Sequence, residues 1–143
     1  MNLIDTNLVM FDVPAKTKEE VIRTIAEAMD KDGRLLDVDG YIADVFAREE
    51  EFTTSIGFGV ATPHAKSEHV AEPSLGYMRL REPMYWGEDQ VDTIFQIAVP
   101  KESAEELHLK ILANVSRHLI HEDFRERLSR AQDPNEVIAM LNE

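Results

Sequence analysis

The sequence contains no cysteine. This absence excludes a disulfide framework and any chemistry that needs a thiol from this chain. It also fits a cytoplasmic location, where disulfides are rare. With 143 residues, the chain has the length of one domain, residues 1–143, and is long enough to bury a substantial hydrophobic core.

Basic residues are far outnumbered by acidic ones. Lysine and arginine contribute 15 positive charges against 28 carboxylates, which gives a formal net charge of −13. Nucleic-acid binding draws on dense positive charge to displace counterions from phosphates, so we expect no nucleic-acid partner. The same balance argues against an anionic membrane surface as a partner. An acidic surface is compatible with electrostatic steering toward a basic protein, and equally with a role in solubility alone.

Long apolar runs are also missing. The most apolar stretch, residues 94–99, is far shorter than the roughly 20 residues that a membrane-spanning helix needs. Residues 1–5 carry no positively charged segment ahead of an apolar core, so we do not expect them to act as a signal peptide. We therefore expect a protein that is not itself embedded in a membrane.

Familiar metal and nucleotide motifs are absent as well. The histidines lie at positions 64, 69, 108, 118 and 121, and their spacing matches neither a HExxH helix nor a Cys/His zinc site. The segment Gly57-Phe58-Gly59 is not followed by Gly-Lys-Ser/Thr and does not complete a Gly-x-Gly-x-x-Gly loop. We expect neither a metal nor a cofactor.

Capping patterns and apolar periodicity predict several helices. Thr17 and Glu20 have the spacing of a capping box, and so do Ser103 and Glu106. Apolar residues at helical intervals follow each pair. The predicted helices cover residues 18–31, 38–50, 103 to 119 or 120, 123–130 and 134–141.

Shorter apolar runs predict the strands. They cover residues 8–13 (a strand or extended arm), 59–63, 75–80 and 93–99, with loops over residues 65–73 and at residues 86 and 87. Residues 93–99 give the strongest signal, because they are nearly all apolar, and this favours a central strand covered on both faces. The mixture of strands and helices predicts an α/β fold: a single domain with a mixed β-sheet flanked by helices on both faces.

Residues 48–64 hold the most informative pattern in the chain. Gly57 and Gly59 allow a sharp turn or a positive φ, which other residues resist. Pro63 restricts its own φ and pushes the residue before it into an extended conformation. His64 is therefore presented from a constrained backbone. An imidazole held beside amide groups that glycine leaves exposed is suited to holding a phosphoryl group.

The same residues carry a family resemblance. The order Arg-Glu, Thr, Gly-x-Gly and Ala-x-Pro-His is similar to the active-site signature of the fructose/mannitol-type EIIA domains of the bacterial sugar phosphotransferase system. The matching residues are Arg48, Glu49, Thr54, Gly57, Gly59, Ala61, Pro63 and His64. Two positions depart from the pattern, with Ser55 where glycine is frequent and Phe58 where a small polar residue is common. The segment Pro63-His64-Ala65-Lys66 and the downstream Trp86 resemble fructose-type members most.

The resemblance implies a phosphotransferase component with a phosphohistidine intermediate. His64 would accept a phosphoryl group from the phosphohistidine of the carrier protein HPr. It would then pass the group to the EIIB component of a sugar permease. A near-neutral imidazole suits this task, because much of it is unprotonated and nucleophilic at pH 7.

The resemblance also assigns supporting residues around His64. Glu106-Leu107-His108-Leu109 is similar to the setting of a second histidine in these domains, which implies that His108 lies beside His64 and donates a hydrogen bond to the phosphoryl oxygens. Arg48 would reach the phosphoryl group with its bidentate guanidinium.

Three further kinds of support are expected from residues 49–59. Glu49 is expected to pair with Arg48 or a histidine rather than to act as a general base. Thr54 is expected either to bind phosphate or to cap the glycine loop. With Gly57 and Gly59, it forms the predicted phosphate-stabilising group.

Two alternatives stay open. A regulatory, nitrogen-related EIIA paralogue would share His64 and act by binding other proteins. A hydrolase that uses two histidines and carboxylates is a weaker third reading. The residues do not identify the transported sugar, the oligomeric state, or whether EIIB and EIIC are separate chains.

Overall fold

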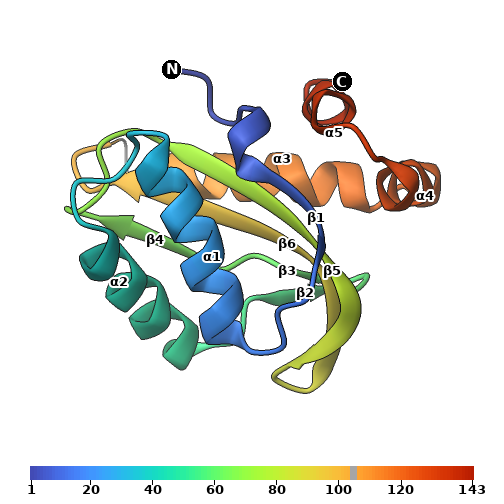
Figure 1. The fold of residues 1–143 in the computed structure, drawn as a ribbon, viewed down its shortest axis with the longest axis horizontal. Helices are drawn as coiled ribbons and strands as arrows, with labels where there is room; N and C mark the ends of the chain where they lie inside the picture. The colour runs from blue at the N-terminus through green and yellow to red at the C-terminus, as the bar shows by residue number, and fades with distance from the viewer. Residues whose placement is uncertain (104–105) are drawn as a thin grey trace.

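A mixed β-sheet forms the centre of the molecule (Figure 1). The computed structural model describes residues 1–103 and 106–143. Within them, the six strands are β1 (Val9–Val13), β2 (Ser55–Gly57), β3 (Val60–Ala61), β4 (His64–Ser67), β5 (Ser74–Trp86) and β6 (Asp89–Pro100). Their order is β1-β5-β6-β3-β2, and β4 also pairs with β6.

Strand β6 is the central strand of this sheet. It pairs with β5 antiparallel on one side and with β3 and β4 parallel on the other. Its residues from Ile94 to Val99 have no exposed surface. The prediction of a central strand covered on both faces, made for residues 93–99, is confirmed.

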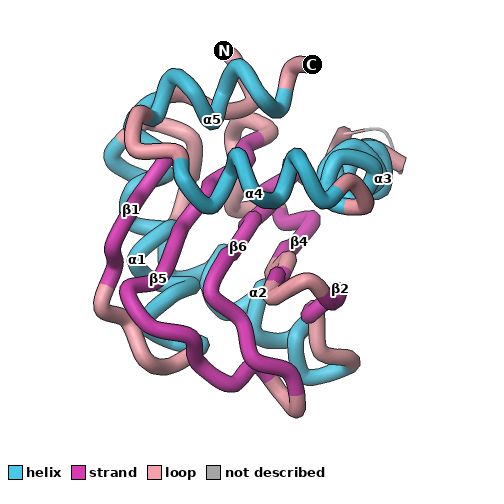
Figure 2. Tube along the Cα trace, turned by 90° about the vertical axis from the view of Figure 1, so that its right-hand side faces the viewer, coloured by secondary structure: helices cyan, strands magenta, loops and turns pink. Residues whose placement is uncertain are grey.

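Helices cover both faces of the sheet, as predicted. The described helices are α1 (Lys18–Lys31), α2 (Val38–Glu51), α3 (Leu107–Leu119), α4 (Glu122–Arg130) and α5 (Pro134–Leu141). In Figure 1, α1 and α2 lie in front of the sheet and α3 lies behind it. Figure 2 shows α4 crossing the strands and α5 running beside it. None of the helices in residues 1–103 and 106–143 is long and apolar enough to cross a membrane.

The start of α1 matches its predicted capping box. The hydroxyl of Thr17 accepts a hydrogen bond from the backbone N–H of Glu20 at 3.1 Å. The helix then packs closely on β5 at Gly76, where an added Cβ would lie 2.5 Å from the side chain of Ile25. A residue without a side chain is therefore what lets α1 approach the sheet.

A buried arginine ties the amino-terminal segment to the rest of the fold. Arg34 has no exposed surface. It pairs with Asp5 at 3.1 Å and with Asp32 at 2.7 Å. It also donates to the hydroxyl of Ser74, at the start of β5, at 3.2 Å. Arg34 therefore joins three segments: the one before β1, the connection between α1 and α2, and β5.

Two loop predictions are wrong. Residues 65–67, predicted as loop, belong to β4, which lies in line with β3 along the same side of β6. The sequence there is polar and short, and parallel pairing with the buried β6 makes it a strand. Trp86, also predicted in a loop, ends β5 and has no exposed surface. Strand β5 continues past Pro83, because its register with β6 shifts between Arg79 and Met84.

The predicted start of the third helix is partly outside the described residues. The capping box predicted for residues 103–106 includes Ala104 and Glu105, which the structure does not describe. Helix α3 begins at Leu107, after Glu106 as the N-cap residue, and it ends at Leu119 as expected.

Candidate functional site

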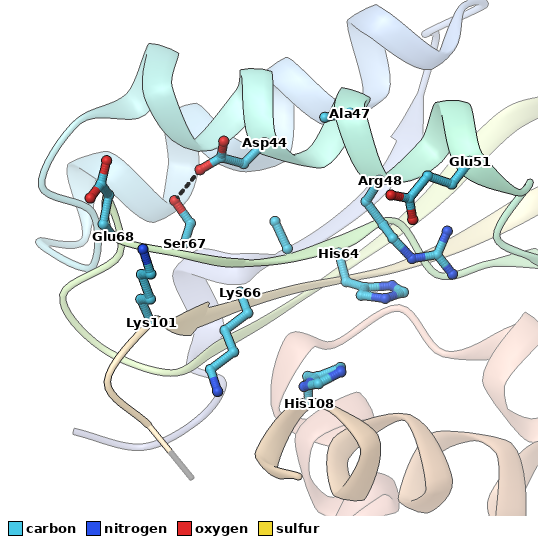
Figure 3. A pocket seen from close by; sticks show the side chains of 11 residues that line it. Asp44, Ala47, Arg48, Glu51, His64, Lys66, Ser67, Glu68, Lys101 and His108 are labelled. Atoms are coloured by element: carbon cyan, nitrogen blue, oxygen red, sulfur yellow. Dashed lines mark hydrogen bonds between the residues drawn. The ribbon is translucent and has the colours of Figure 1, made fainter. Parts of the chain in front are cut away.

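A pocket with a volume of about 470 Å³ lies between α2, β4 and the start of α3. Helix α2 contributes Asp44, Arg48 and Glu51, the strand β4 contributes His64, Lys66 and Ser67, and α3 contributes His108. Glu68 and Lys101 follow the ends of β4 and β6. Figure 3 shows His64 in this pocket, with Arg48 on one side and His108 on the other.

His64 is the first residue of β4 and is held in a single orientation. It pairs with Ile97 of β6, and the preceding carbonyl, that of Pro63, accepts a hydrogen bond from the N–H of Ile97 at 3.0 Å. Only 8% of His64 is exposed, although it lines the pocket. The central strand thus fixes the backbone on which the imidazole stands.

The hydrogen bond of His64 determines its tautomer. Its Nδ1 lies 2.8 Å from the carbonyl oxygen of Thr62. Because a carbonyl oxygen can only accept, Nδ1 carries the proton and Nε2 carries the lone pair. The unprotonated nitrogen is thus the nitrogen that does not face the backbone, and it is the nucleophilic atom of the ring.

The surroundings of His64 keep the ring neutral. Burial lowers its pKa below the ordinary value of 6.5, and the positive charge of Arg48 and the proximity of His108 lower it further. The hydrogen bond to Thr62 and the carboxylate of Glu49 act in the opposite direction without reversing the shift. At neutral pH the ring therefore retains its lone pair.

His108 lies beside His64, as the family resemblance implied. The two ring centroids are 6.0 Å apart and the ring planes are inclined by 24°. Its Nδ1 is buried and has no hydrogen-bond partner among residues 1–103 and 106–143. The other ring nitrogen, Nε2, is the one available to a group in the pocket.

Arg48 comes from the last turn of α2 and points into the same pocket (Figure 3). Its Nη1 donates to the carbonyl of Phe52 at 3.2 Å, which satisfies a carbonyl beyond the helix end. The guanidinium has further N–H donors for an anion. The structure thus brings together His64, His108 and Arg48.

Glu49 has other partners than those predicted. It was expected to pair with Arg48 or a histidine, but its side chain turns inward, and the residue is only 7% exposed. It accepts hydrogen bonds from the ammonium of Lys18 at 3.2 Å, the indole N–H of Trp86 at 3.2 Å, and the backbone N–H of Thr54 at 3.0 Å. Successive helical residues point about 100° apart, so Glu49 faces the interior when Arg48 faces the pocket.

Thr54, Gly57 and Gly59 do not line the pocket. The hydroxyl of Thr54 donates to Glu49 at 2.5 Å. Gly57 ends β2 and Gly59 lies in the turn before β3, with φ values of 87° and 73°. Their positive φ confirms that these positions need the conformational freedom of glycine. The two residues do not, however, lie in the pocket with His64. These glycines precede β3, which pairs with β6 at Thr93 and Ile94, whereas His64 pairs with β6 farther along, at Ile97.

Lys66 is a pocket residue that the sequence analysis missed. It lies two residues after His64 in β4, and alternate residues of a strand point to the same face. Recognition of residues 64–67 as a strand would have identified it. Lys101 was also missed, and it enters the pocket because it directly follows the central strand.

Comparisons with known proteins identify the family of this chain. The family model described as "Phosphoenolpyruvate-dependent sugar phosphotransferase system, EIIA 2" matches residues 2–143. The "PTS system fructose-specific EIIA component" of Haloferax volcanii is 36% identical over 95% of this chain and 90% of its own length. Other curated relatives are longer, and the chain spans 17% of the length of one and 22% of another.

Solved structures show the same fold. The nitrogen regulatory protein IIA-Ntr of Neisseria meningitidis superposes with a TM-score of 0.88 at 25% identity, over 97% of this chain and 96% of that one. The IIA component in a complex of mannitol IIA with phosphorylated IIB from Escherichia coli gives a TM-score of 0.83 at 22% identity, over 97% and 96%. The match of the family model over nearly the whole chain leads to one conclusion: the chain belongs to the EIIA 2 family of the phosphoenolpyruvate-dependent sugar phosphotransferase system.

Proposed function

We propose that Nε2 of His64 accepts a phosphoryl group from the phosphohistidine of HPr and passes it to an EIIB component of a fructose-type permease. The observation that carries the proposal is the 2.8 Å contact between Nδ1 of His64 and the carbonyl of Thr62. It leaves the lone pair on Nε2, in a pocket that also holds Arg48 and His108. The 36% identity to a fructose-specific EIIA component supports the sugar class.

The transfer is a single displacement at phosphorus. The lone pair of Nε2 of His64 forms a new N–P bond, while the N–P bond of the donor phosphohistidine breaks and its electron pair returns to the donor nitrogen. The proton on Nδ1 of His64 does not move. The ring then carries positive charge, which the carbonyl of Thr62 stabilises. The reverse sequence, with an EIIB side chain as nucleophile, discharges the carrier.

Positive groups around His64 complement the phosphoryl oxygens. Phosphoryl transfer depends mainly on positioning and on stabilising the charge of the transferred group. Arg48 offers paired N–H donors, and His108 offers a ring N–H. Lys66 adds a second cation beside Arg48, in a molecule whose net charge is −13. Asp44, Glu51 and Glu68 line the same pocket, so it offers a phosphoryl group placed N–H donors rather than an excess of positive charge.

A regulatory role is the second candidate. The TM-score of 0.88 to a nitrogen regulatory IIA protein supports it. Such a protein would carry the same phosphohistidine and would act through protein binding rather than sugar uptake. Both roles place the protein in the cytoplasm, as its cysteine-free composition suggests.

Reconstituted phosphorylation tests the proposal. The protein is incubated with enzyme I, HPr and phosphoenolpyruvate, and we expect one acid-labile, base-stable phosphate on His64. His64→Ala abolishes the signal, whereas the control His69→Ala, at a half-buried histidine outside the pocket, retains it. Phosphate that persists in His64→Ala would overturn the assignment. Transfer onward to the EIIB of a fructose permease separates the transport role from the regulatory one, and turnover without a phosphate donor would favour the hydrolase.

A further inference from the structure

A buried chain of hydrogen bonds runs behind the pocket and ends at His64. It begins at the carboxylate of Glu49, which is 7% exposed and accepts from the ammonium of Lys18 and the indole N–H of Trp86, both at 3.2 Å. The same carboxylate accepts from the backbone N–H of Thr54 at 3.0 Å and from its hydroxyl at 2.5 Å. Four donors thus converge on one carboxylate.

The chain continues from Thr54 to the ring. The carbonyl of Thr54 accepts two hydrogen bonds from Thr62, one from its N–H at 2.9 Å and one from its hydroxyl at 3.2 Å. The carbonyl of Thr62 in turn accepts from Nδ1 of His64 at 2.8 Å. Thr54 and Thr62 are 5% and 2% exposed, so water does not compete for these groups.

We propose that Glu49 is a positioning residue for His64, because its carboxylate fixes Thr54, Thr54 fixes Thr62, and the carbonyl of Thr62 holds the ring proton on Nδ1. The inference rests on the proposed function in one respect only, that His64 is the phosphoryl acceptor. Glu49 does not touch the reacting atoms. It acts by keeping the lone pair on the nitrogen that faces the phosphoryl donor.

The composition of the network explains why a carboxylate is needed. A buried carboxylate is costly unless it is paired and fully hydrogen-bonded. Lys18 supplies the countercharge and lies 5.2 Å above the ring of Trp86, so α1 and β5 both close around the carboxylate. Lys18, Trp86 and the N–H of Thr54 all donate to Oε2, while the hydroxyl of Thr54 donates to Oε1. A neutral amide has one acceptor oxygen, so when that oxygen stands at Oε2 its NH2 group faces the hydroxyl of Thr54, which can no longer donate to it. Thr54 would then lose part of its anchor.

A second hydrogen bond holds the same segment and supplies a control. The hydroxyl of Ser55 donates to a carboxylate oxygen of Asp89 at 2.5 Å, at an exposed position. Its removal alters residues 53–55 without touching the buried chain. Glu50, the exposed neighbour of Glu49 in α2, is the matched control for charge. Effects that are specific to Glu49 therefore separate positioning from general weakening of the segment.

The test compares Glu49→Gln with the controls Glu50→Gln and Ser55→Ala by two readouts. The ¹⁵N NMR spectrum of His64 in the unphosphorylated protein reports which ring nitrogen carries the proton. In the wild type and both controls we expect the proton on Nδ1 alone. In Glu49→Gln we expect both tautomers, and a rate of phosphorylation about ten- to a hundredfold lower, as for small displacements of a reacting group.

Each outcome either supports or overturns the inference. A single Nδ1–H tautomer in folded Glu49→Gln would overturn it, regardless of the rate of phosphorylation. If that variant does not fold, Thr54→Val decides, since it removes only the hydroxyl bond to Glu49. We then expect a partial tautomer shift that Thr54→Ser restores, and an unchanged spectrum in Thr54→Val overturns the inference. The tautomer is measured without any donor protein, so a wild type that takes up no phosphate would refute the proposed function and leave this test intact.

Discussion

The imidazole of His108 lies nearly parallel to that of His64, with ring centroids 6.0 Å apart. One ring comes from the start of a helix and the other from a strand on the central part of the sheet. Because the rings are neighbours without a direct hydrogen bond between them, a phosphoryl group on one can be contacted by the other. This relationship leads to the first prediction.

Replacement of His108 separates a donor role from a packing role. His108→Gln keeps an N–H donor at the site, so we expect it to retain part of the phosphoryl transfer, whereas His108→Ala loses about a hundredfold in rate, the scale of one removed donor. Rapid-quench phosphorylation by phospho-HPr measures both rates. Equal rates in the two variants, or unfolding of either, would assign His108 to packing alone.

Arg48 is expected to matter for transfer more than for stability. Arg48→Ala removes the guanidinium from the pocket and should slow phosphorylation by about 10²- to 10³-fold. The variant also loses the bond to Phe52, which costs about 1 kcal/mol in the free energy of unfolding. Arg48→Lys keeps the charge but not the paired donors, and we expect an intermediate rate. Transfer rates and urea unfolding of the three proteins check this order.

The lowered pKa of His64 sets the pH dependence of phosphoryl acceptance. Because the ring protonates only below its ordinary value of 6.5, we expect the rate of phosphorylation to be maintained at pH 6.5 and to fall only in more acidic solution. Arg48→Ala removes a charge that lowers this pKa, so the acidic fall should move to higher pH in that variant. A pH titration of His64 by NMR measures both shifts.

The same pKa affects stability, with a defined sign. The unfolded chain binds a proton at His64 near pH 6.5, while the folded chain does so only at lower pH. Stability from this group is fully present above 6.5 and is lost as the pH falls toward the folded pKa. His64→Gln should flatten this part of the curve of unfolding free energy against pH. An identical curve would show that the ring titrates alike in both states.

Arg34 should be essential for stability and irrelevant to transfer. Arg34→Met leaves Asp5 and Asp32 without their buried cation, and we expect a loss of about 3–5 kcal/mol in the free energy of unfolding. Arg23→Met is the matched control, because its ion pair with Asp39 is exposed and is worth about 0–1 kcal/mol. Urea denaturation measures the difference. Losses of similar size in both variants would contradict the assignment of Arg34 as a buried anchor.

Local signals in the sequence predicted the helices closely. Thr17 and Glu20 form the expected cap, and α1 covers the predicted residues 18–31. Strand β4 escaped prediction, because Ala65-Lys66-Ser67 has no strand-like composition and takes its structure from pairing with β6. Tertiary pairing decides such a segment, and no local pattern reports it.

The candidate site, too, was predictable only in part. The convergence of His64, His108 and Arg48 came from the family resemblance, since no spacing rule brings residues 48, 64 and 108 together. The inward turn of Glu49 could not be predicted, because its partners Lys18 and Trp86 lie far from it in the sequence. Gly57 and Gly59 were predicted to bind phosphate because glycine allows unusual backbone conformations. The sequence did not indicate where their loop would lie relative to His64.

The alignment of β3 and β4 along β6 gives the carrier a stationary acceptor. The carbonyl of Pro63 accepts a hydrogen bond from β6 between the two short strands, so the pairing with β6 continues up to His64 and holds its backbone in place. Arg48 and His108 stand at helix termini, where side chains can readjust. On the proposed function, we therefore expect His64 to gain and lose a phosphoryl group without rearrangement of the polypeptide backbone.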